Sequence, residues 1–454
     1  MSLGRARYGL LVILVMVVAA YFGLPWLLRG PGPMDFGGGS VDLAGYHDAD
    51  PTGVPPELAG ADLVKRGEYL ARAADCEACH TAKGGAPYAG GVAFVLPFGT
   101  LYSTNITPDN ETGIGGYSDA DFLNAIHNGI ARSGARLYPA MPYASYTYIT
   151  DADALAIKAY LFSLQPIHAS APENTLRFPY NQRWLMVVWS FLFNADRRFE
   201  PVPAQSPQWN RGAYLAEAMA HCGECHTPRN PFQALNNREK FSGAVQAGWH
   251  AYNITADRDS GVGGWSDEEL TQYLAVGHAD GRGTAAGPMG EAVDESLSHL
   301  TPGDIAALVV YLRSVPAIAS SDLPALQTAL APISPKEGVG AGTNPRGVAV
   351  YESACASCHG WTGIGPLTGY ATLTGSRAVN DPAATNVVQI VLSGMQRQTP
   401  DGRVFMPAFG AAYSDAEIAD VANFITARFG AKPSAVMASD VAKLRAAQAV
   451  SSGH

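Results

Sequence analysis

All six cysteines of this 454-residue chain lie in copies of one pattern, Cys-x-x-Cys-His. The three copies run over residues 76–80, 222–226 and 355–359. Because no cysteine is left over, the chain has none for a disulfide framework or for a separate catalytic thiol. The first cysteines of successive copies are 146 and then 133 residues apart. Spacing and length together predict three repeats, each with one motif.

Composition excludes several classes of protein. Charged residues make up 15% of the chain, hydrophobic residues make up 47%, and the formal net charge is −10. Such an acidic chain lacks the basic face that displaces counterions from phosphates, so we expect no nucleic-acid partner. Its hydrophobic content also exceeds that of a disordered chain. We therefore expect a folded protein whose chemistry resides in the repeated motif.

The longest apolar stretch is near the N-terminus. Residues 8–28 are 21 consecutive uncharged residues, with Arg5 and Arg7 before them and Arg29 after them. A helix of this length spans about 30 Å, the thickness of a bilayer's hydrocarbon core. The stretch is longer than the apolar core of a cleaved signal peptide, so we expect an uncleaved anchor, with a removed signal as the alternative. The two preceding arginines favour a cytoplasmic N-terminus and place the remaining chain outside the cytoplasm.

Repeats 1 and 2 share a longer register than the motif alone. Each contains Asn-Ile-Thr and, eight residues later, the start of a glycine-rich block that ends in Ser-Asp, at Ser118 and at Ser266. A methionine follows that serine by 23 residues in both, at Met141 and at Met289. Repeat 3 is shorter, but it also places a methionine, Met406, before its last predicted helix. The common plan is a helix, the cysteine motif, loops, a methionine and a closing helix.

Helix boundaries follow from this register. An Arg-Gly pair stands before each motif in helical spacing, which predicts a short helix that ends at the cysteines. Serine followed by aspartate is a typical N-cap. The further helices predicted by this pattern cover residues 120–128, 151–164, 268–276, 302–315 and 415–429.

The motif itself predicts covalently attached haem c. On a helical turn, two thiols reach the two vinyl groups of one haem while the adjoining imidazole reaches the iron. A redox dithiol or half of a zinc site would not require the histidine three times. The predicted attachment residues are Cys76, Cys79, Cys222, Cys225, Cys355 and Cys358, and the predicted proximal iron ligands are His80, His226 and His359.

Methionine is the predicted second axial ligand. Met141, Met289 and Met406 are the candidates, because a thioether ligand suits a high-potential haem that transfers electrons. The alternative is that they are ordinary core methionines. An iron with six ligands leaves no position for a substrate, so we expect electron transfer and predict no catalytic residue on this chain.

Other axial ligands stay open. Met395 could replace Met406 in repeat 3, although it lacks the Met-Pro context. His127 and His278 are histidine alternatives in repeats 1 and 2, but they break the register that the methionines keep.

At this point the chain resembles a known family, the three-haem cytochrome c subunits of membrane-bound bacterial dehydrogenases. The resemblance covers about residues 62–430. It rests on Arg-Gly-Glu-Tyr-Leu at 66–70, Tyr-Ser-Thr-Asn-Ile-Thr-Pro-Asp at 102–109, Leu-Tyr-Pro-Ala-Met-Pro-Tyr at 137–143 and His-Cys-Gly-Glu-Cys-His-Thr-Pro-Arg at 221–229.

The resemblance implies a non-catalytic subunit that passes electrons from a periplasmic dehydrogenase to ubiquinone, at the bacterial inner membrane. The catalytic partner it implies is a molybdopterin and iron-sulfur aldehyde dehydrogenase or a PQQ alcohol dehydrogenase, with flavin-dependent gluconate or sorbitol dehydrogenases as relatives. An N-terminal anchor favours the aldehyde type. The alternatives are a stand-alone carrier that feeds a terminal oxidase and a haem enzyme with one labile methionine.

These observations predict a mainly α-helical protein, with three tandem cytochrome c-like domains behind one N-terminal transmembrane helix. An apolar run at 178–193 is too short to span a bilayer; it is either buried between haem domains or lies at the membrane surface or a subunit interface. The expected boundaries are 1–30 for the anchor, 31–60 for a linker, 61–170 for repeat 1, 171–207 for an apolar linker, 208–318 for repeat 2, 319–343 for a second linker, 344–430 for repeat 3 and 431–454 for a C-terminal tail.

Overall fold

The computed structural model describes residues 15–36 except 17, 20, 22 and 26, together with residues 50–328 and 344–452. These residues form a mainly helical protein with two-stranded antiparallel hairpins. No helix among them is both long and apolar enough to cross a bilayer. Much of the predicted anchor, including residues 8–14, lies outside the described residues, and so does most of the second linker.

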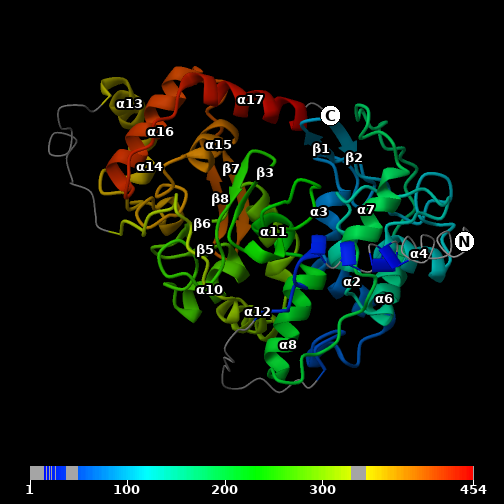
Figure 1. Cartoon of the computed structure of the whole chain (residues 1–454). Coiled ribbons are helices and arrows are strands. Elements are labelled where there is room, and N and C mark those ends of the chain that lie inside the picture. The colour runs from blue at the N-terminus through cyan, green and yellow to red at the C-terminus, as the bar shows by residue number, and fades with distance from the viewer. Residues whose placement is uncertain are drawn as a thin grey trace, which may run out of the picture.

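Figure 1 shows the elements in chain order. Repeat 1 contains η1 (Pro56–Leu58), α2 (Leu63–Ala73), α3 (Cys76–His80), β1 (Ala93–Leu96), β2 (Gly99–Tyr102), α4 (Asp119–Asn128), α5 (Tyr143–Tyr146) and α6 (Asp151–Ser163). The connecting segment contains α7 (Leu185–Phe193).

Repeat 2 contains α8 (Pro207–Ala213), η2 (Tyr214–Met219), α9 (Gly223–His226), η3 (Asn237–Glu239), β3 (Ala244–Gln246), β4 (Trp249–Ala251), α10 (Asp267–Val276), β5 (His278–Ala279), β6 (Gly283–Thr284), α11 (Pro288–Glu295), η4 (Leu297–His299) and α12 (Pro302–Ser314). Repeat 3 contains α13 (Pro345–Val350), η6 (Tyr351–Cys355), α14 (Ala356–His359), η7 (Gly369–Ala371), α15 (Thr385–Ser393), β7 (Met395–Thr399), β8 (Gly402–Met406) and α16 (Asp415–Phe429), and α17 (Ala438–Ser452) follows it.

The predicted helix starts are confirmed. Ser118, Ser266 and Ser414 are the N-caps of α4, α10 and α16, and each takes part in a capping box with an acidic residue three positions later. In a capping box, the serine oxygen and the acidic side chain each accept a backbone N–H, which satisfies two donors at the exposed helix start. The closing helices α6 and α12 match the predicted ranges to within one residue.

Each repeat is built on the contact of its first and last helices. α2 packs on α6, α8 on α12, and α13 on α16. A glycine lies at each contact, and a Cβ would come within 1.8 Å of the Ala156 oxygen at Gly67, 2.0 Å of the Ala307 oxygen at Gly212 and 2.4 Å of the Asp420 oxygen at Gly347. These glycines belong to the three Arg-Gly pairs of the sequence. Sterics therefore explain why each Arg-Gly pair contains a glycine, because only glycine lets the two helices approach this closely.

Buried side chains gather in two main cores. One continuous cluster joins repeats 1 and 2, and it includes Leu70, Ile157, Trp209 and Leu308. Repeat 3 has a separate cluster around Tyr351. The first two repeats therefore share one core.

Repeats 1 and 2 exchange equivalent hydrogen bonds. Tyr69 of α2 donates its hydroxyl to Asp304 Oδ2 of α12 at 2.5 Å, and Tyr214 of η2 donates to Asp153 Oδ2 of α6 at 2.5 Å. Asp304 also receives two hydrogen bonds of 2.7 Å from the buried guanidinium of Arg211. Because each repeat contacts the same place on the other, the pair resembles a twofold, self-complementary interface.

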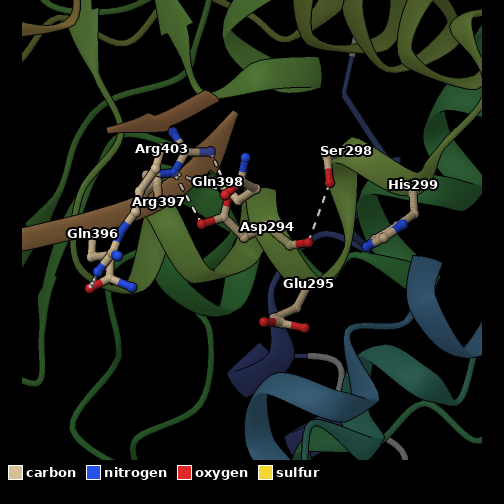
Figure 2. A pocket seen from close by; sticks show the side chains of 8 residues that line it. All are labelled: Asp294, Glu295, Ser298, His299, Gln396, Arg397, Gln398 and Arg403. Carbon is tan, nitrogen blue, oxygen red and sulfur yellow. Dashed lines mark hydrogen bonds and ion pairs between the residues drawn. The ribbon is translucent and has the colours of Figure 1, made fainter. Parts of the chain in front are cut away.

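Repeat 3 packs against repeat 2. Arg397 of β7 binds Asp294 of α11 at 2.6 Å and donates to the carbonyl oxygen of Gly277 at 3.1 Å. An open cavity of about 450 Å³ lies at this contact, lined by residues of α11, η4 and the β7–β8 hairpin (Figure 2). Repeat 2 therefore lies between the other two repeats, as Figure 1 shows, and α17 extends from repeat 3 to β1.

The linker at 31–60 also makes contacts with repeats 1 and 2. Gly53 donates its N–H to Asp153 Oδ2 at 2.9 Å and accepts from Arg211 at its carbonyl oxygen at 2.9 Å. Phe36 packs against the shared core. Where the structure describes it, this segment therefore completes the interface between repeats 1 and 2.

The first interpretation of the apolar run at 178–193, burial between haem domains, holds only in part: α7 contacts repeats 1 and 2, but one of its faces is exposed. Leu192 is the single buried residue of α7, and Trp184, Val187, Val188 and Phe191 are exposed. The cause is that α7 packs on Tyr143 of α5 and on Phe232 mainly through the side that carries Trp189 and Phe193.

Replacing Gly212 by alanine should destabilise the unit formed by repeats 1 and 2. The new Cβ would collide with backbone, so we expect a loss of about 1–3 kcal/mol, the usual cost of overpacking. Thermal or denaturant unfolding of the haem-loaded protein measures it. The matched control is Gly303→Ala in the facing helix α12, where the nearest atom to a new Cβ is 3.9 Å away. Equal stability of both variants would contradict the steric explanation.

Candidate haem attachment sites

Each cysteine motif lies on a short helix directly after the first helix of its repeat. The motif helices are α3, α9 and α14. In repeats 2 and 3 the preceding helix widens into the π-helical segments η2 and η6 just before or at the first cysteine. In repeats 1 and 2 a residue with positive φ, Asp75 at 53° and His221 at 37°, turns the chain into the motif. Such local distortions are typical of functional sites.

The three motif histidines are held in the same way. Nδ1 lies 2.6 Å from a backbone carbonyl oxygen in each case, from Thr104 for His80, from Tyr252 for His226 and from Ala371 for His359. A carbonyl oxygen can only accept, so Nδ1 carries the proton and Nε2 keeps its lone pair. This is the arrangement that orients an imidazole for metal binding through Nε2.

Burial keeps these imidazoles neutral. It lowers the pKa of His80, His226 and His359, against the smaller opposing effect of the carbonyl hydrogen bond. A neutral imidazole is the form that binds iron, so the surroundings of all three histidines fit the proximal role.

Five of the six motif cysteines lie in surroundings that disfavour a thiolate. Burial raises the pKa to about 12 for Cys76, Cys79 and Cys222, and to about 11 for Cys225 and Cys355. A redox dithiol and a zinc ligand both act as thiolates. A thioether sulfur carries no charge, so these positions fit covalent haem attachment better than either alternative.

The candidate methionines lie in the same cores as the motifs. Met141 and Met289 pack, partly buried, against the shared core, and so do Cys76 and Cys222. Met406 packs in the same way against the core of repeat 3. Met141 lies just before α5, Met289 lies in the first turn of α11, and Met406 ends β8.

The structure brings both methionine candidates of repeat 3 together. Met395 begins β7 and is the direct cross-strand partner of Met406 in the antiparallel hairpin. Opposed residues of such a pair project from the same face of the hairpin. The register of the hairpin therefore does not decide whether Met395 or Met406 is the axial ligand.

The two histidine alternatives differ: both ring nitrogens of His278 have partners, whereas the buried Nε2 of His127 has no hydrogen-bond partner among the described residues. His278 places Nδ1 2.9 Å from the Thr284 hydroxyl and Nε2 3.2 Å from Asp280 Oδ1. Both of its ring nitrogens are engaged, so nothing here favours it as an iron ligand. His127 is buried with Nδ1 3.7 Å from Asp151 Oδ1, and burial lowers its pKa to about 4.

The motifs of repeats 1 and 2 lie side by side. The helix that carries Met289, α11, contacts α3, and α5, which follows Met141, contacts η2. Ser145 of α5 donates to Glu224 of the second motif at 2.8 Å. Burial raises the pKa of Cys79, and nearby Asp75 and Cys225 add to the effect. Each methionine-bearing segment therefore packs near the motif of the other repeat.

A polar contact ties the second motif to repeat 3. Tyr252, whose carbonyl oxygen holds His226, lies with its hydroxyl 3.3 Å from Asp381 Oδ2. His250 Nδ1 lies 2.9 Å from the same oxygen. The sequence reasoning missed Asp381 and the interface residues Asp153 and Asp304. For the last two, a signal was present: each stands three residues after a threonine N-cap in matching helices.

Comparisons with known proteins agree with these sites. The cytochrome c family model matches residues 64–165, and the model described as cytochrome C oxidase, cbb3-type, subunit III matches residues 342–425. These matches place cytochrome c domains in repeats 1 and 3, and such domains carry covalently bound haem c.

Curated relatives match nearly the whole chain. It is similar to the fructose dehydrogenase cytochrome subunit of Gluconobacter japonicus, with 39% identity over 89% of this chain and 87% of that protein. It is similar to the gluconate 2-dehydrogenase cytochrome c subunit of Pantoea cypripedii, with 40% identity over 84% of this chain and 89% of that protein. The alcohol dehydrogenase (quinone) cytochrome c subunit of Gluconacetobacter polyoxogenes is 35% identical over 85% of each chain. The chain therefore belongs to the family of cytochrome c subunits of bacterial dehydrogenases.

Proposed function

We propose that this chain is the electron-transfer subunit of a membrane-bound, quinone-linked dehydrogenase complex and that it carries three haems c. The observation that carries the proposal is the histidine arrangement, repeated three times with the same 2.6 Å contact to a backbone carbonyl. Three independent segments would not keep this geometry unless each served the same group. The boundaries of the three repeats are part of the proposal.

Within each repeat, the residues have separate tasks. Two cysteines would fix the haem covalently, the histidine would bind one face of the iron through Nε2, and Met141, Met289 or Met406 would bind the other. The methionines and the first cysteine of each motif pack against, or belong to, the shared core or the core of repeat 3. When bound, haem c supplies a one-electron redox centre.

The packing of the repeats favours a carrier over three isolated sites. Repeat 2 contacts both of the others, through the exchanged Tyr–Asp hydrogen bonds on one side and the Arg397–Asp294 ion pair on the other. The three proposed haems would thus lie within repeats that pack directly on one another. We propose no substrate-oxidising residue on this chain.

The proposed partners are a catalytic dehydrogenase subunit and ubiquinone, at the periplasmic face of the inner membrane. The apolar stretch at 8–28 supports a single N-terminal span. For the catalytic subunit, that stretch favours an aldehyde dehydrogenase, of the molybdopterin type, whereas the named relatives serve fructose, gluconate and alcohol dehydrogenases. We propose the aldehyde type and retain these others as alternatives.

The first test counts haems. A pyridine haemochrome assay should find three haems c per chain, because each motif has a complete donor set. Replacing both Cys355 and Cys358 by alanine should leave two, since repeat 3 has its own core and its loss spares the shared one. Two haems in the unaltered chain, or none in the variant, would contradict the proposal.

The second test identifies the axial methionines. Met141→Leu, Met289→Leu and Met406→Leu nearly conserve volume, so each should remove a ligand without emptying the core. Redox titration should show one midpoint potential lowered by on the order of 100 mV in each variant. Met219→Leu is the control and should leave all midpoint potentials unchanged. Met219 is fully buried in the core that repeats 1 and 2 share. If Met395→Leu lowers the third potential and Met406→Leu does not, the ligand of repeat 3 is Met395.

The third test identifies the partner. The chain, purified in mild detergent from its own cell membranes, should bring along a larger catalytic chain. Its haems should then be reduced by one substrate from a panel of acetaldehyde, ethanol, gluconate and fructose, and reoxidised by added ubiquinone analogue. Purification without any other chain, with reduction by soluble cytochromes alone, would support the stand-alone carrier instead.

A further inference from the structure

The exposed side of α7 is the least usual surface of the described residues. Trp184, Val187, Val188 and Phe191 recur at the i, i+3, i+4 and i+7 spacing of one helical face, and all four are exposed. Trp184 is 63% exposed and Val188 is 51% exposed. No charged residue occurs from 184 to 193. A helix face of this kind in water marks a binding surface.

The opposite side of α7 is firmly held. Trp189 donates its indole N–H to the carbonyl oxygen of Phe232 at 2.8 Å and packs edge-on against Tyr143. Asn194, at the end of the helix, donates to the carbonyl oxygen of His127 at 2.8 Å. The exposed face is therefore fixed in place by the protein.

The end of the N-terminal apolar stretch lies on this same helix. Arg29 donates to the carbonyl oxygens of Phe191 and Leu192, at 2.8 Å each. These carbonyls belong to the last turn of α7, which lacks helical partners and favours a cation. The rings of Tyr21 and Phe191 are 4.9 Å apart. Figure 1 shows the N-terminal residues, in blue, next to α7.

We propose that the exposed face of α7 lies in the interfacial layer of a phospholipid bilayer. The occupant follows from continuity: the bilayer-length apolar stretch at 8–28 meets α7 at its own last turns, so a bilayer that holds the stretch also meets this face. Tryptophan and apolar side chains on a short fixed helix suit that layer, where an aromatic ring has apolar and polar neighbours together. The inference rests on the proposed membrane location.

Spin labels test this placement in the full, haem-loaded chain. Val188→Cys supplies a labelling site on the face, and Val187→Cys is a second site in case the first variant does not mature. Val245→Cys is the matched control, because Val245 is 63% exposed on β3, far from α7 in sequence. The labelled chains are placed in vesicles of phosphatidylethanolamine and phosphatidylglycerol. Flotation, haem content and collision of the label with oxygen and with a water-soluble nickel chelate are then measured.

At position 188 we expect oxygen access with several-fold less nickel access than at position 245, because oxygen partitions into lipid and the chelate does not. Equal nickel access at both positions, in chains that float with the vesicles, would overturn the inference and leave the anchor standing. Protection from both reagents would also overturn it, because protein, such as a second copy or a partner subunit, would then cover the face. Chains that do not float would overturn the membrane location and the inference together.

Discussion

The close contact between the first and last helix of each repeat is the constraint on which the rest depends. Gly67, Gly212 and Gly347 bring two helix backbones into direct contact, and the cysteine motif begins within ten residues of each glycine. The end of the first helix is therefore fixed against the last helix before any cofactor is considered. This contact therefore fixes the place from which the chain enters the cysteine motif. A side chain larger than hydrogen would separate the helices and move the motif.

The shared core of repeats 1 and 2 rests on a second device, a pair of exchanged hydrogen bonds. Tyr69 and Tyr214 occupy equivalent places, and each donates to a carboxylate near the start of the other repeat's closing helix. Buried carboxylates are costly unless they are fully hydrogen-bonded. Asp304 meets this need with Tyr69 and Arg211, and Asp153 meets it with Tyr214 and Gly53. Each of these tyrosine–aspartate hydrogen bonds joins repeat 1 to repeat 2. Both are made only when the two repeats pack in this one arrangement.

The surroundings of the motifs suit a cofactor that is attached and then left undisturbed. The surroundings of five motif cysteines and of the three motif histidines favour the uncharged form of each side chain, and the histidine proton is directed to a backbone carbonyl. Burial lowers the pKa of His80, His226 and His359, which favours the neutral imidazole that would bind the iron. A low-dielectric, rigid environment reduces reorganisation when charge changes, which suits electron transfer.

The sequence by itself determined the local features, because they depend on neighbours in the chain. The capped helices at Ser118, Ser266 and Ser414 were predictable, since a cap needs residues only three positions apart. The cysteine motifs and the paired register of Met141 and Met289 were also predictable, because covalent attachment and internal repetition fix spacing.

Tertiary structure alone decided the features that join distant residues. The exchange between Tyr69 and Asp304 links positions 235 residues apart, and the contacts of Tyr252 and His250 with Asp381 link separate repeats. The apolar composition of α7 did not reveal whether it is buried; the packing of Trp189 and the contact with Arg29 leave its opposite face exposed. The choice between Met395 and Met406 stayed open even in the structure, because the hairpin places them side by side. Local pattern fixes what each repeat contains, and the packing of repeats on one another fixes what its surfaces meet.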